Sequence, residues 1–111
     1  MKLTDLQPEW IDWQGRHGIG MTIKCMTGHC TGRQWILFAN PLDGGPAWEG
    51  QCVQLMFDMA KDKEAFGPVY DRPCGQVRWK RIGEAFESMS LQPSINAHEC
   101  GHLTLTNGVF G

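Results

Sequence analysis

The chain has 111 residues, 41% of them hydrophobic, which is enough for one domain with a buried core. A formal net charge of −2 argues against a nucleic-acid binder, which would carry an excess of lysine and arginine. The sequence has no apolar run of the roughly 20 residues that span a bilayer, and MKLTDLQPEW lacks the apolar stretch of a secretory signal. These features predict a cytoplasmic protein that binds neither membranes nor nucleic acids.

The first half of the chain is expected to contain two strands. Residues 1–18 read as an irregular arm with one short turn. Apolar and polar side chains alternate at 21–25 and predict a strand, and the evenly apolar run 34–38 predicts another that is buried on both faces. Residues 39–46, ANPLDGGP, predict a tight loop. The asparagine and aspartate of this loop are expected to cap it by bonding to nearby backbone N–H groups.

The hydrophobic period changes to that of a helix between residues 48 and 66. The side chains at i, i+3, i+4 and i+7, which would form its buried face, are Val53, Met56, Phe57 and Ala60. Cys52 lies in the same apolar stretch and is expected to be a core residue. The segment 47–66 is therefore predicted to be a helical insertion in a β domain.

The C-terminal part again has the patterns of β structure. Residues 77–80 alternate, and we expect the basic run RWKR to lie on a solvated strand face rather than to bind an anion. Short alternating runs at 88–91 and 103–106 predict further strands. Asn107-Gly108 then indicates a tight hairpin or the end of the last strand. With fourteen glycines and six prolines, residues 1–111 are predicted to form one mainly β (α+β) domain. Its core would be a small antiparallel sheet or β-sandwich-like arrangement with one helix.

The stretch HECGH at residues 98–102 matches the H-E-x-x-H pattern of zinc metalloproteases. That pattern works on a helix, but Gly101 lies inside the stretch and an alternating run follows it. In an extended strand, His98 and His102 would lie about 13 Å apart, too far to share one ion. We therefore expect a β-type metal site. In it, Cys100 would share a strand face with His102 or with His98, or a bulge at Gly101 would turn all three inward.

A second cluster, KCMTGHC, lies at residues 24–30. Cys25 and Cys30 have four residues between them, as some zinc-ligand pairs do, and His29 is a further candidate. An odd cysteine count without an export signal suggests reduced thiols, and clustered Cys and His then indicate a metal. Thiolate and imidazole suit Zn²⁺ better than Mg²⁺ or Ca²⁺. The predicted ligands of one tetrahedral zinc site are Cys25, Cys30, His102 and either Cys100 or His98.

Three segments of the chain contain motifs in a recognisable order. They are FANPLDGGP (38–46), WKRIGEAFESMSLQPSI (79–95) and HLTLTNGV (102–109). This order resembles an uncharacterised family that is abundant in bacteriophage genomes and sometimes mislabelled ammonia monooxygenase. The resemblance implies a protein of phage or prophage origin in the cytoplasm of a bacterial host.

Members of that family are similar to small zinc peptidases of bacterial ubiquitin-like conjugation operons, which use a Cys, a Glu and two His. The similarity implies that the metal ligands are Cys25 or Cys30, His98 and His102. The chain departs from the family pattern in three ways. Its cysteines are spaced C-x₄-C, no Trp precedes the last His, and 47–66 is inserted. The choice of ligands therefore stays open.

The same similarity assigns the role of general base to Glu87, and Glu99 is an alternative because it flanks the metal candidates. Two functions follow. The first is a zinc-dependent peptidase or deconjugase acting on a protein tail, which needs an open position on the metal for water. The second is a non-enzymatic module, stapled by a closed zinc site, that binds a protein partner. A metal-free protein with a chance motif is the third alternative.

Overall fold

The computed structural model describes residues 1–29, 31–62, 77–97 and 100–111 of the chain. Over these ranges the fold is mainly β, with small antiparallel sheets and one α-helix, as the sequence predicts. The Cα atoms have a radius of gyration of 12.8 Å, close to the roughly 13 Å expected for a compact chain of this length. None of the described helices is long and apolar enough to cross a membrane.

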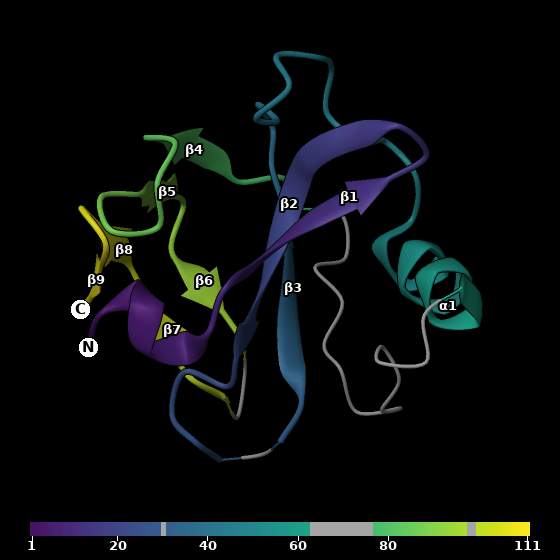
Figure 1. Cartoon of the computed structure of the whole chain (residues 1–111). Coiled ribbons are helices and arrows are strands. Elements are labelled where there is room, and N and C mark those ends of the chain that lie inside the picture. The colour runs from purple at the N-terminus through teal and green to yellow at the C-terminus, as the bar shows by residue number, and fades with distance from the viewer. Residues whose placement is uncertain (30, 63–76, 98–99) are drawn as a thin grey trace.

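The central sheet has three strands in the order β1-β2-β3 (Figure 1). They are β1 (Glu9–Trp13), β2 (Arg16–Lys24) and β3 (Arg33–Leu37), and both neighbouring pairs are antiparallel. Four consecutive residues of β3 are buried, which confirms the prediction of a strand buried on both faces. In β2 the residues from Gly18 to Ile23 are also buried. The sheet is therefore covered on both sides.

The N-terminal residues are not the irregular arm that was expected. A short 3-10 helix, η1 (Leu3–Leu6), leads into β1, which pairs with β2 up to Trp13 and Arg16. The turn between these strands is Gln14-Gly15, with φ of 50° and 77°. A two-residue hairpin turn with positive φ at both positions normally has Asn or Asp first. Gln14 does not give that signal, so the hairpin could not be recognised from the sequence.

The described residues contain one α-helix, α1 (Cys52–Asp62), and it lies within the predicted insertion. The prediction of its buried face was wrong. The buried side chains are Cys52, Leu55 and Met59, whereas Val53 and Phe57 are 42% and 61% exposed. Both sets follow helical spacing, so periodicity alone could not distinguish them. Cys52 is 1% exposed, as expected of a core residue, but it is disulfide-bonded and not a reduced thiol.

Three two-stranded sheets lie on the side of the central sheet opposite α1 (Figure 1). They are β4 (Lys80–Ile82) with β5 (Ser90–Gln92), β6 (Ile95–Asn96) with β7 (His102–Leu103), and β8 (Leu105–Thr106) with β9 (Val109–Phe110). Asn107 and Gly108 have φ of 50° and 79°, which confirms a tight hairpin between β8 and β9. The predicted strand at 77–80 begins later, and Trp79 forms only an isolated bridge with Phe38.

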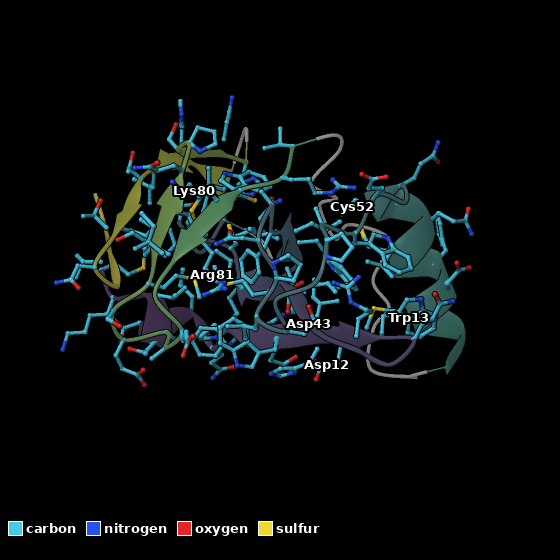
Figure 2. All side chains as sticks on the ribbon, turned by 90° about the horizontal axis from the view of Figure 1, so that it is seen from above. Asp12, Trp13, Asp43, Cys52, Lys80 and Arg81 are labelled. Atoms are coloured by element: carbon cyan, nitrogen blue, oxygen red, sulfur yellow. The ribbon has the colours of Figure 1, made fainter. Side chains whose placement is uncertain are left out.

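The arginines of the basic run are not on a solvated face, so that prediction is wrong for them. Arg78 is half-buried and donates hydrogen bonds to the carbonyls of Trp48 (2.7 Å) and Gly50 (2.6 Å). Burial lowers the pKa of Arg78 below its ordinary value. Figure 2 shows Arg81 well inside the outline of the molecule and Lys80 nearer its edge. The two arginines hold loops, and Lys80 alone of the three is exposed.

Of the two polar side chains in the 39–46 loop, Asp43 has the capping role that was predicted, whereas Asn40 bonds to a distant strand. Asn40 exchanges two hydrogen bonds of 2.7 Å with the backbone of Arg81, which fixes the loop to β4. Asp43 accepts a hydrogen bond from the N–H of Gly45 (2.9 Å) and one from Nε of Arg16 (2.7 Å). The loop is therefore fastened at both ends.

Replacing Asp43 with Asn is expected to remove an acid-sensitive part of the stability. The hydrogen bond from Arg16, then that from the Gly45 N–H, lowers the pKa of Asp43 from its ordinary value of 3.8. A carboxyl group with a depressed pKa stabilises the fold above its unfolded pKa, and this contribution is lost as the pH falls further. The melting temperatures of the two proteins should differ by a small constant amount above about pH 5 and converge below about pH 4. A difference that grows with acidity would contradict the assignment.

Candidate metal centre

Two hairpin loops meet at one end of the central sheet and carry the candidate site. The first connects β2 with β3, and the second connects β6 with β7. In the first loop the N–H of Gly28, whose φ is 70°, donates to the carbonyl of Cys25 (3.2 Å). This tight turn reverses the chain, so that His29 returns toward Cys25. In the second loop the N–H of Cys100 donates to the carbonyl of Ala97 (3.0 Å).

Gly101 allows the two loops to pack closely. Its φ is 113°, a backbone conformation that residues other than glycine rarely adopt. A Cβ atom on Gly101 would lie 3.0 Å from Cγ2 of Thr27. The backbone of the second loop thus lies directly against a side chain of the first. As a result, Cys100 lies close to Cys25 and His29, which are two residues before and after Thr27.

Cys25, His29 and Cys100 form a group that can hold a metal ion. One ligand atom from each residue lies within 4.8 Å of the other two. Sγ of Cys100 is 3.8 Å from Nδ1 of His29, and Oγ1 of Thr27 is 3.5 Å from Sγ of Cys25. Cys25 and Cys100 are 6% and 3% exposed and belong to the hydrophobic core, whereas His29 is exposed. The group therefore spans the boundary between the core and solvent.

The distances within this group fit a tetrahedral zinc ion. With Zn–S of about 2.3 Å and Zn–N of about 2.0 Å, a sulfur and a nitrogen ligand lie about 3.6 Å apart and two sulfurs about 3.8 Å apart. The Cys100 and His29 ligand atoms, at 3.8 Å, already have nearly that separation. The other two pairs of ligand atoms lie at most 4.8 Å apart, so the atoms of each pair would have to approach each other by about 1 Å at most. Small side-chain rotations would complete the geometry.

The structure brings together one residue from each predicted cluster, Cys25 and Cys100. His29, which the sequence offered only as a spare candidate, joins them because of the turn at Gly28. His102 lies outside the group: it is exposed, and its Nε2 is hydrogen-bonded to Oγ of Ser94 (2.7 Å). Cys30, His98 and Glu99 are outside the described residues.

Cys100 and His102 do not share a strand face as was expected. The φ of 113° at Gly101 interrupts the extended backbone, so that Cys100 turns into the core while His102 stays at the surface. The same φ excludes a continuous α-helix through the second half of HECGH. The match to the zinc metalloprotease pattern is therefore not accompanied by its helix.

Glu87, the predicted general base, is exposed in the turn between β4 and β5. It does not join the Cys-His-Cys group, and that turn and the β2–β3 loop lie at separate edges of the molecule (Figure 1). Comparisons of the chain with protein-family models, with curated proteins and with solved structures find no match. The chemistry of the site therefore rests on its own residues.

A groove of about 560 Å³ adjoins the candidate metal group. Its mainly apolar wall includes Met1, Leu6 and Met26, and it is bordered on the side of the group by Cys25, Thr27 and Gly28. A groove of this size is within the range of small-ligand sites. Cys25, although only 6% exposed, is one of the residues that line this groove.

Replacing Gly101 with Ala is expected to weaken metal binding. The added Cβ would press against Thr27, and the positive φ would be strained, at a cost of about 1–3 kcal/mol that falls on the loop carrying Cys100. With added Zn²⁺ as the probe, we expect its Kd, measured by chelator competition, to rise about tenfold or more. Gly44→Ala is the matched control, because Gly44 also has a positive φ but has nothing within 4 Å. Equal effects of the two substitutions would contradict the packing argument.

Proposed function

We propose that this protein is a zinc-binding β domain in which the metal staples the β2–β3 loop to the β6–β7 loop. The observation that carries the proposal is the cluster of Cys25, His29 and Cys100, with ligand atoms within 4.8 Å of one another. Two buried thiols and an imidazole are ligands that zinc prefers over harder metals. The chemistry of the donors thus favours Zn²⁺.

A structural role of the metal is supported by what it would connect. Cys100 and His29 are 71 residues apart in sequence, and α1 and four of the described strands lie between them in the chain. β6 and β7 have two residues each, and so short a hairpin is hardly stable by itself. Since zinc binding contributes free energy of folding, the ion would fix this hairpin to the central sheet. Such a closed site suits a non-enzymatic module that binds a protein partner.

A fourth ligand is expected from the residues next to the three described ones in the sequence. Cys30 follows His29 directly, and His98 precedes Cys100 by two residues. Either would complete the four ligands of a structural site. The sulfur count of the bound metal distinguishes them, because Cys30 would raise it from two to three.

A zinc-dependent peptidase is the second candidate, and the groove beside Cys25 is the observation that favours it. A substrate in this groove would lie next to the metal. The resemblance to phage proteins and to peptidases that act on ubiquitin-like tails supports the same candidate. The reaction would need an open metal position and a nearby carboxylate. Because Glu87 lies elsewhere on the surface, Glu99, which directly precedes Cys100 in sequence, is the better candidate base.

Metal content tests the proposed zinc site. The protein should be purified without a His-tag or added metal and analysed by elemental mass spectrometry. We expect one zinc per chain, lost in Cys25→Ser and Cys100→Ser and weakened in His29→Ala. His102→Ala is the matched control and should keep its zinc, because His102 bonds to Ser94 instead of joining the group. A wild-type protein without zinc would overturn the proposal.

Incubation with a mixed peptide library, read by mass spectrometry, separates the two candidate functions. The stapled module should leave every peptide intact. Cleavage that needs zinc and is lost in Glu99→Gln, with zinc content unchanged, would instead establish the peptidase. Glu87→Gln serves as the comparison. If Glu87 were the general base, this variant and not Glu99→Gln would be inactive.

A further inference from the structure

We propose that Cys25 and Cys100 are also a redox pair, which peroxide converts into a disulfide that excludes the metal. The inference rests on the proposed zinc site, because it assigns a second state to the same two sulfur atoms. Neither cysteine is disulfide-bonded in the structure. The site would then exist in two exclusive forms, a zinc-bound dithiolate and a metal-free disulfide.

The geometry places the two sulfur atoms within reach of a covalent bond. They are at most 4.8 Å apart, and a disulfide requires about 2.0 Å, so each has to move by about 1.4 Å at most. Rotation of the cysteine side chains together with a small shift of the loops can supply this movement. Gly28, in the first loop, has no atom within 4 Å of the position of a Cβ, so that loop has room to adjust.

The surroundings of the two sulfurs differ, and the difference defines how an oxidant reaches them. Both cysteines are buried in the core, at 6% and 3% exposure for Cys25 and Cys100, but only Cys25 of the two lines the groove. Peroxide entering by the groove would therefore meet Cys25 first. Cys100, held within 4.8 Å of it, is then the resolving thiol. This arrangement favours a disulfide over further oxidation of Cys25.

The reaction balances with hydrogen peroxide as the oxidant. The thiolate of Cys25 attacks one peroxide oxygen, the O–O bond breaks, and a sulfenic acid and a hydroxide ion result. The thiolate of Cys100 then attacks the sulfenic sulfur, an S–S bond forms, the S–O bond breaks, and a second hydroxide ion leaves. The two cysteines lose two electrons to one peroxide, and two protons from solvent convert the two hydroxide ions to water. Neither sulfur of the disulfide keeps the negative charge with which the thiolate bound the metal. The zinc ion is therefore released.

The test follows zinc and sulfur in the zinc-loaded protein during treatment with hydrogen peroxide. A chromogenic chelator should record the release of one zinc per chain. Tryptic digestion without reduction should then yield peptide 25–33 joined to peptide 82–111, because cleavage follows Lys24, Arg33 and Arg81. Since peptide 25–33 also contains Cys30, the experiment is repeated with Cys30→Ser. The joined peptides should persist in that variant, and thioredoxin with its reductase should restore zinc binding.

Three results of the peptide analysis would overturn the inference. They are a link that disappears in Cys30→Ser, a disulfide within peptide 25–33 instead of between the peptides, and sulfinic acid at Cys25 with no link. Zinc that is bound but never released by peroxide would also overturn it while leaving the proposed zinc site intact. If the wild type contained no zinc but still formed the link, the zinc site would fail and the redox pair would stand.

Discussion

Removal of the proposed zinc ion by a chelator is expected to lower the melting temperature by roughly 15 °C. A ligand present at a thousand times its Kd stabilises the native state by about 4 kcal/mol, and about 1 kcal/mol corresponds to several degrees in a chain of this size. The lost stability is that of the link between the β2–β3 and β6–β7 loops. The measurement is calorimetry of the zinc-loaded and metal-free protein, without reductant so that the disulfide of Cys52 is kept.

The control variants make this prediction specific. Cys100→Ser should have a low melting temperature that the chelator does not change, and His102→Ala should respond like the wild type. Hydrogen exchange should show that metal removal exposes the amides of β6 and β7 more than those of β2, because the central sheet has its own core. An unchanged melting temperature after proven loss of zinc would contradict the structural role of the metal.

Replacing Gly20 with Ala is expected to cost at least about 3 kcal/mol of stability. Gly20 lies in the middle of β2, paired with Leu37 of β3. An added Cβ would lie 2.2 Å from the carbonyl oxygen of Ile36 and 2.9 Å from Cα of Leu37. Both are backbone atoms, so no side-chain rotation relieves the overlap, and the two strands would have to separate. Denaturant unfolding would measure the cost.

Gly15→Ala is the control for this substitution. Gly15 has a positive φ of 77° in the β1–β2 turn but nothing within 4 Å of a Cβ. Its replacement should cost only the backbone strain, about 1–2 kcal/mol. If Gly15→Ala were the more damaging of the two, close packing of β2 against β3 would not be the reason for Gly20.

Those parts of the fold that depend on local patterns were predictable from the sequence. The evenly apolar run 34–38 indicates a buried strand, and Asn107-Gly108 indicates a hairpin, because each pattern has one main physical cause. The buried face of α1 was not predictable, since Leu55 and Phe57 are equally apolar and tertiary packing alone selects between them. Likewise, the strand predicted at 21–25 begins earlier, at Arg16, and Gly18 and Gly20 lie inside it, where close packing requires them.

The candidate site was predictable as a meeting of two Cys/His clusters but not in its detail. Ligand spacing suggests Cys25 and Cys100 because metal chemistry restricts the residue types. The contribution of His29 depends on the Gly28 turn, and the outward position of His102 depends on the φ of Gly101. Alternation along a strand cannot reveal a single residue that breaks it. Glycines inside a metal-binding motif are therefore the positions where an assumption of regular strand geometry fails first.

X-ray absorption at the zinc edge of the purified protein tests the central claim most directly. A site built on Cys25, His29 and Cys100 predicts at least two sulfur ligands at about 2.3 Å and at least one nitrogen at about 2.0 Å. In His29→Ala, which should bind zinc more weakly but still bind it, the zinc-loaded protein should keep its sulfur count and lose one nitrogen ligand. A first shell of nitrogen and oxygen alone in the wild type would contradict the account, because both buried thiols would then lie away from the metal.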